Sequence, residues 1–68
     1  MQNQPPIKNK IQQNRESKGI NQQELATALG VSRCYLSKLE NQKFSPSPEL
    51  MAKVCRYFDM GLGNMFRI

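Results

Sequence analysis

The chain has 68 residues, enough for a single domain with one core, and a domain of this size buries only a modest fraction of its surface. Ten lysine and arginine residues oppose five acidic ones, so the net charge is +5, which favours polyanionic partners such as nucleic acid or an anionic membrane surface. The chain has no histidine, no glycine-rich phosphate loop and no evident pair of catalytic carboxylates, so we expect neither an enzyme nor a site for a metal, a cofactor or a small-molecule ligand.

The two cysteines, Cys34 and Cys55, are too far apart in the sequence for a CxxC motif. The N-terminal residues are polar and lack the apolar region of a signal peptide, and no stretch is apolar for long enough to span a bilayer. These features together predict a cytoplasmic protein with two free thiols.

Residues 1–6 are polar and end in two prolines, which predicts a flexible N-terminal arm, and residues 7–68 predict one domain. Ile7 and Ile11 lie on one face of a first helix that we expect to begin at Ile7 and to stop at Gly19. Polar side chains surround the rest of this helix.

The second and third helices have clear start signals. Asn21 is a good N-cap, and Glu24 lies where a capping box requires an acidic side chain. The second helix then runs to Gly30, and Ser32 caps a third helix that reaches about Asn41. The apolar residues expected to face the core or to staple these helices are Leu25, Ala26, Leu29, Val31, Leu36 and Leu39.

Residues 42–47 predict a loop, after which Ser47, Pro48 and Glu49 form a strong helix start: a capping serine, a proline at the first position and an acid in the first turn. The fourth helix extends to about Phe58, and the tail from residue 61 predicts at most a short fifth helix. Because no segment alternates as a strand does, the predicted fold class is all-α, with four to five helices.

The most informative segment is residues 22–39, two short helices joined at Gly30. Helices this close in sequence must turn sharply, and glycine adopts the positive φ that such a turn needs. A side chain larger than that of Ala26 would push the two helices apart, while Leu36 and Leu39 hold the second helix of the pair against the first. The spacing therefore predicts a helix-turn-helix.

The sequence of this segment, NQQELATALGVSRCYLSKLEN, is followed by a basic loop and by SPELMAKV. It resembles the Cro and phage-repressor (Xre-like) helix-turn-helix family of small transcriptional regulators, and the resemblance extends over residues 7–66. The resemblance implies a compact lambda-repressor-like domain whose third helix enters the major groove of double-stranded DNA.

By matching positions, the resemblance implies that the third helix presents its exposed residues to base edges. Arg33 and Lys38 are the best candidates, since both can donate to guanine O6 and N7. The full set of expected base-reading residues is Arg33, Cys34, Tyr35, Ser37 and Lys38. The expected phosphate contacts are Gln22, Gln23, Ser32, Lys43 and Phe44, the first of which lies at a helix N-terminus that attracts anions.

The resemblance also implies a partly buried ion pair between Arg15 and Glu40, joining the first and third helices. The sequence departs from the family at Asn14, which replaces an apolar residue and should leave a hole or a polar contact in the core, and at Gln42, where glycine is frequent and a left-handed turn would be strained. A third departure lies in the tail, where Gly61, Gly63 and Asn64 make the last helix weak and put the dimer in doubt.

Other interpretations exist for several residues. Arg33 and Lys38 taken alone would be ordinary solvated charges, and only their place on the third helix favours base contacts. Cys34 is expected to be a passive groove-facing residue rather than a redox switch, and Cys55 to pack in the core. Phe44 would either wedge between bases or pack onto the domain, with packing favoured.

Members of this family usually dimerise to bind two half-sites, so we expect a homodimer built with the last helix and the tail. The same apolar residues would otherwise complete the core of the monomer, and the sequence leaves both alternatives open. The candidate dimer residues are Phe58, Leu62, Met65, Phe66 and Ile68.

The predicted function is sequence-specific binding of double-stranded DNA as a transcriptional regulator, in particular a repressor that occupies an operator as a homodimer. Two alternative functions are less favoured. An antitoxin or another protein-interaction module would use the same fold to mask a partner, and a basic membrane-surface peptide would need one amphipathic helix rather than several inward-facing ones.

Overall fold

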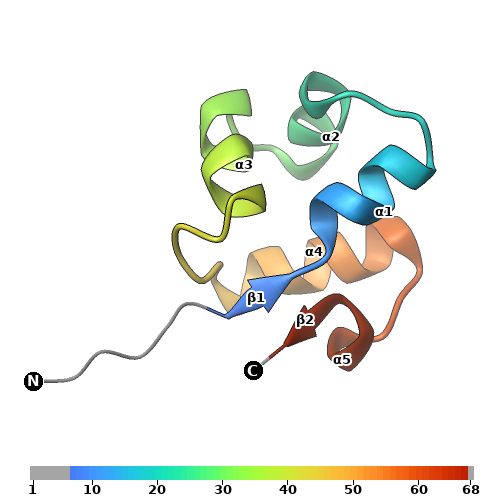
Figure 1. Ribbon diagram of the computed structural model, residues 1–68, viewed down its shortest axis with the longest axis vertical. Coiled ribbons are helices and arrows are strands. Elements are labelled where there is room, and N and C mark those ends of the chain that lie inside the picture. The colour runs from blue at the N-terminus through green and yellow to red at the C-terminus, as the bar shows by residue number, and fades with distance from the viewer. Residues whose placement is uncertain (1–6, 68) are drawn as a thin grey trace, which may run out of the picture.

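The computed structural model describes residues 7–67, so the predicted arm at residues 1–6 lies outside the described residues. The prediction of a small helical fold with four to five helices is confirmed, although a short strand pair accompanies the helices. The elements in chain order are β1 (Lys8–Asn9), α1 (Ile11–Ser17), α2 (Gln22–Leu29), α3 (Arg33–Glu40), α4 (Pro48–Phe58), α5 (Leu62–Met65) and β2 (Phe66–Arg67). Figure 1 shows α2 and α3 side by side, with α4 and the two strands across the other end of the molecule.

The core is formed by apolar side chains from all five helices and from β2. Helices α2, α3 and α4 each contribute two or more residues at a spacing that places them on one face, as the sequence pattern predicted, while α1 and α5 contribute one residue each. The buried apolar residues are Ile11, Leu25, Ala26, Leu29, Leu36, Leu39, Leu50, Val54, Phe58, Met65 and Phe66. Cys55, predicted to be buried, is only half-buried against this core.

The predicted capping signals are confirmed by hydrogen bonds. Asn21 and Glu24 form a reciprocal capping box at the start of α2. The Ser32 hydroxyl accepts from the Tyr35 N–H at 3.0 Å, and the Ser47 hydroxyl accepts in the same way at the start of α4. Since the first N–H groups of a helix have no partner within the helix, these side chains fix where each helix begins.

The turn between α2 and α3 depends on Gly30, which has a φ of 75°. An added Cβ would meet only the Lys53 Nζ atom at 3.8 Å, so the backbone conformation rather than crowding requires glycine. We therefore expect Gly30→Ala to lower the free energy of unfolding by about 1–2 kcal/mol in urea denaturation. Gly63→Ala is the control, because Gly63 lies in α5 with open space around it and should gain about 0.5–1 kcal/mol. Equal changes in the two variants would contradict this account.

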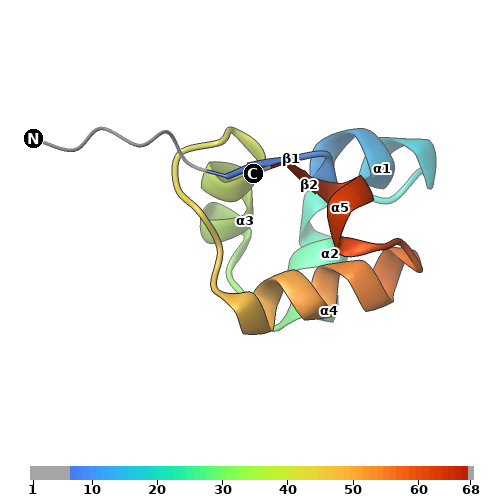
Figure 2. The same ribbon diagram turned by 90° about the horizontal axis from the view of Figure 1, so that it is seen from below.

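The prediction that no segment forms a strand is wrong for four residues. β1 and β2 pair antiparallel, with Lys8 opposite Arg67 and Asn9 opposite Phe66. Figure 2 shows the pair lying beside α1 and α5, on the opposite side of the molecule from α4. Two residues are too few for an alternating pattern to be recognised in the sequence.

The first helix is shorter than predicted, since it begins at Ile11 rather than at Ile7. The residues before it make other contacts. The Lys10 N–H donates to the Met65 carbonyl, and the Asn9 side chain accepts from the Ile11 N–H. Ile7 still packs against the core, but from an extended segment. Sequence periodicity could not distinguish these two ways of burying the same side chain.

The two expected departures from the family have different outcomes. Asn14 makes no hole in the core, because it is only half-buried and its side chain donates to the Lys10 carbonyl at 2.8 Å. Gln42 does adopt a left-handed conformation, with a φ of 62°, as expected. For a residue with a Cβ this conformation costs roughly 1–2 kcal/mol.

The C-terminal apolar residues mostly complete the core of the monomer. Phe58, Met65 and Phe66 are 7%, 1% and 3% exposed, so their side chains are not available to a partner without rearrangement. Leu62 remains 48% exposed. Ile68, the last candidate for a dimer contact, lies outside the described residues.

Candidate nucleic-acid interface

Helix α3 has one buried and one exposed face. Leu36 and Leu39 are fully buried against the core and Glu40 is buried at the end of the helix, whereas the other side chains of α3 are exposed or half-buried. Of the five residues predicted to read bases, Arg33, Cys34, Tyr35 and Lys38 are exposed and Ser37 is half-buried. The predicted set therefore lies together on the outward face of a single helix.

A shallow depression of about 420 Å³ runs along this face, where α2 meets α3. It is lined by Gln22, Arg33, Cys34, Ser37 and Lys38. The lining thus combines two cations, Arg33 and Lys38, with one amide, one thiol and one hydroxyl. A surface of this kind can donate hydrogen bonds to acceptors on base edges or to phosphate oxygens.

Tyr35 is less free than its neighbours on the helix. Its ring lies 4.9 Å from the ring of Phe44, measured between centroids, with the two planes tilted by 51°. Phe44 in turn packs against the core, so of its two predicted roles the structure favours packing onto the domain over insertion between bases. Tyr35 thereby connects α3 to the loop that follows it, and the residue as a whole is 36% exposed.

The expected phosphate contacts lie around the two helix starts and the loop after α3. Gln23 and Ser32 are exposed near the starts of α2 and α3, and Lys43 is exposed in the loop. The Gln23 side chain donates to the Thr27 hydroxyl at 3.1 Å. The N–H groups at a helix start and a nearby lysine are groups that commonly bind phosphate oxygens.

Gln22 has a structural partner that the sequence did not indicate. Its Nε2 atom donates to the Glu40 Oε1 atom at 2.9 Å, and the residue is half-buried. One amide hydrogen is therefore engaged inside the domain. The other groups of the amide remain for any outward contact.

The predicted ion pair between Arg15 and Glu40 is present. The Arg15 Nε atom lies 2.7 Å from the Glu40 Oε2 atom, and a second bond of 3.3 Å joins Nη2 to Oε1. Both side chains are buried, and Arg15 also donates to the Ile20 carbonyl at 2.9 Å. The hydrogen bond to Glu40 is the main cause of a raised pKa at Arg15, so the guanidinium stays charged throughout the ordinary pH range.

These contacts converge on the carboxylate of Glu40, the last residue of α3. Arg15 comes from α1 and Gln22 from α2, so one carboxylate joins three helices. The position of α3 relative to its supporting helices is thus fixed by hydrogen bonds as well as by apolar packing. No buried side-chain nitrogen or oxygen in residues 7–67 lacks a hydrogen-bond partner.

Among residues 7–67, no three histidine, cysteine, aspartate or glutamate side chains cluster as metal ligands would. Within the same residues, no helix has both the length and the apolar character needed to cross a membrane. Cys34 is exposed and Cys55 half-buried, and both are free thiols.

The fold and the exposed face of α3 define a helix-turn-helix domain. The Helix-turn-helix family model matches residues 11–63, and the chain belongs to this family, in its Cro/C1-type form. The family consists of DNA-binding transcriptional regulators rather than enzymes.

Several relatives support this assignment. The chain is 36% identical over 52 residues to the ImmF control region 10 kDa protein of Bacillus phage phi105, a match that covers 76% of this chain but only 58% of the phage protein. It is 33% identical over 60 residues to an uncharacterized HTH-type transcriptional regulator of Methanocaldococcus jannaschii, covering 88% of this chain and 91% of that protein.

Solved structures show the same fold. The clp gene regulator ClgR from Corynebacterium glutamicum superposes with a TM-score of 0.69 at 38% identity, over 78% of this chain and 69% of that one. A protein from Bacteroides fragilis superposes with a TM-score of 0.79 over 90% of this chain and 98% of that one, and at 21% identity it supports the fold alone.

Proposed function

We propose that this protein binds specific sequences in double-stranded DNA by placing α3 in the major groove. The observation that carries the proposal is the outward face of α3, where Arg33 and Lys38 both line a shallow depression on a helix held in place through Glu40. Bidentate donation from such side chains to guanine is the commonest specific contact in protein–DNA complexes. The net charge of +5 favours the phosphate backbone around the site.

Phosphate contacts are proposed for the residues that surround α3. Gln22, Gln23 and Ser32 lie near the starts of α2 and α3, and Lys43 lies just beyond the end of α3. Contacts on both sides of the recognition helix would set its orientation in the groove, while base contacts from the helix itself would set the sequence.

The experiment that tests this function is selection of bound duplexes from a random DNA library, followed by footprinting. We expect the selected duplexes to share a base-sequence motif, with one stretch of the major groove contacted by each protomer. Enrichment of no motif, at low ionic strength and with protein shown to be folded, would contradict the proposal.

We further propose that the protein acts as a homodimer and as a repressor. A dimer would read two half-sites about one helical turn apart, and among the candidate dimer residues that the structure describes, Leu62 is the one left exposed. A dimer bound to an operator that overlaps a promoter would block transcription from that promoter. This role is in line with the name of the phage relative, a control region protein.

Sedimentation of the protein at micromolar concentration tests the dimer. We expect a dimer in the presence of a two-half-site duplex, and Leu62→Lys should shift it towards one protomer per duplex, because burial of a charge at an apolar contact is unfavourable. A single protomer on that duplex at all concentrations would contradict the dimer but not DNA binding.

A further inference from the structure

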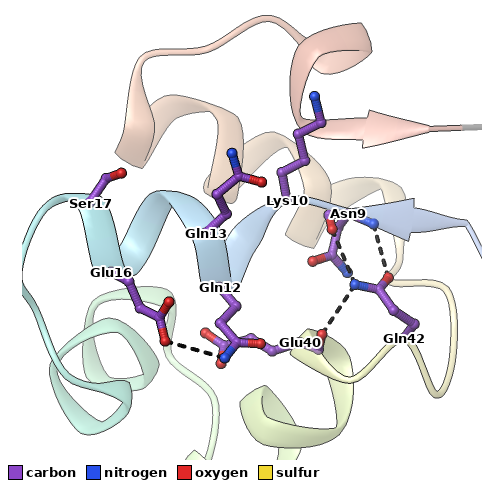
Figure 3. A pocket seen from close by; sticks show the side chains of 8 residues that line it. All are labelled: Asn9, Lys10, Gln12, Gln13, Glu16, Ser17, Glu40 and Gln42. Carbon is purple, nitrogen blue, oxygen red and sulfur yellow. Dashed lines mark hydrogen bonds between the residues drawn. The ribbon is translucent and has the colours of Figure 1, made fainter.

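Gln42 forms the turn that follows α3 in a backbone conformation that glycine adopts without strain. Its side-chain amide makes three hydrogen bonds: Oε1 accepts from the Asn9 N–H at 3.0 Å, and Nε2 donates to the carbonyls of Asn9 and Glu40, each at 3.1 Å. Figure 3 shows the amide between β1 and the end of α3. The amide pairs with the main chain of Asn9 as a neighbouring strand would.

The Asn9 side chain completes the connection from the other side. Although polar, Asn9 is only 9% exposed, and its Nδ2 atom donates to the Leu39 carbonyl at 3.0 Å while its Oδ1 atom accepts from the Ile11 N–H. One residue of β1 is therefore bonded to the end of α3, to the turn after it and to the start of α1.

A second contact joins the same extended segment to the loop. The Ile7 N–H donates to the Ser45 hydroxyl at 2.7 Å. Residues 7–9 thus bind the loop at Gln42 and again at Ser45, and the two residues between these points are Lys43 and Phe44. On its other side β1 is held by β2, whose Phe66 is part of the core.

We propose that Gln42 is a positioning residue that clamps β1 to the loop after α3, so that Lys43 is held where it contacts a DNA phosphate. This proposal rests on the proposed function, because the clamp would act on DNA binding through the phosphate contact of Lys43. It explains why a side chain is present at a left-handed position: the amide bonds offset the strain that glycine would avoid.

The test compares Gln42→Gly, Lys43→Ala and the double variant on a duplex obtained by selection. Gln42→Gly should weaken binding about three- to fivefold, as should Lys43→Ala, and each should reduce the slope of log affinity against log salt by about one unit or less. In the double variant the loss should not exceed that of either single variant by more than twofold, because both changes remove the same contact. Unchanged affinity of Gln42→Gly, or losses that multiply in the double variant, would overturn the proposal.

Stability and hydrogen exchange separate the clamp from simple strain. Asp59 is the other described residue with a side chain at positive φ, at 55°, so Asp59→Gly is the matched control. Relief of strain should raise the midpoint of thermal unfolding in Asp59→Gly but not in Gln42→Gly, where the clamp is lost as well. The Asn9 amide should exchange at least tenfold faster in Gln42→Gly, with the Leu36 amide unchanged. An Asn9 amide that stays protected would overturn the clamp.

The two ideas fail in distinguishable ways. If the unchanged protein selects no duplex, the proposed function is wrong and the action through Lys43 is wrong with it, whereas the exchange rate at Asn9 still decides whether Gln42 holds β1. If DNA is bound specifically and Gln42→Gly binds equally well, only the positioning role is wrong.

Discussion

The Arg15→Met variant is expected to lose about 3–5 kcal/mol of unfolding free energy, because it leaves the Glu40 carboxylate buried without its cationic partner. A domain of this length has roughly 3–10 kcal/mol of stability in total, so much of the variant should be unfolded at 37 °C. Urea denaturation followed by circular dichroism at 222 nm measures the loss. Gln22 alone, with its single bond to the carboxylate, cannot replace the guanidinium.

Two further variants make the cause of this loss clear. Lys18→Met removes the same charge from the exposed end of α1 and should change stability by no more than about 0.5 kcal/mol. Arg15→Met combined with Glu40→Leu should recover most of the lost stability, since no unpaired charge then stays behind. A double variant as unstable as Arg15→Met would show that packing of the arginine stem, rather than the charge, accounts for the effect.

The helix boundaries that the sequence predicted well are those fixed by local chemistry. The Asn21, Ser32 and Ser47 caps each act within three residues of their own position, so their residue types and spacing suffice. Gly30 is predictable for the same reason, since the turn it forms is local.

The features that the sequence did not predict depend on residues far apart in the chain. The start of α1 was misplaced because Ile7 and Asn9 are held by Ser45, Gln42 and the C-terminal strand. Nothing in the local sequence of residues 7–10 distinguishes a strand of two residues from a first helical turn, since pairing partners 30 to 60 residues away decide it.

In the candidate site too, features set by local sequence were predictable and those set by distant contacts were not. The exposed set on α3 follows from helical periodicity once Leu36 and Leu39 are placed inward. The bond from Gln22 to Glu40 and the packing of Tyr35 on Phe44 could not be predicted, because they depend on how α3 meets α2 and the loop. The one signal for the Gln42 clamp was a glutamine where a left-handed turn was expected.

Arg33→Ala is expected to weaken binding of the selected duplex by about 5- to 150-fold, because each good base contact contributes roughly 1–3 kcal/mol of discrimination. Binding to random duplex should fall far less, since no base contact of fixed geometry is made there. The prediction rests on the position of Arg33 at the start of α3, beside the depression that also includes Lys38. Fluorescence anisotropy on both duplexes at fixed salt concentration measures the two affinities.

Arg56→Ala is the matched control, because Arg56 is an exposed arginine on α4 outside the residues that line the α3 depression, and its loss changes the net charge equally. The effect of that variant measures the general electrostatic contribution and should be similar on both duplexes. Arg33 also borders a second depression that includes Gln22 and Gln23, where a phosphate contact is the competing role. Equal losses on selected and random duplexes for Arg33→Ala would assign Arg33 to that phosphate contact, and base reading by α3 would then depend on Lys38.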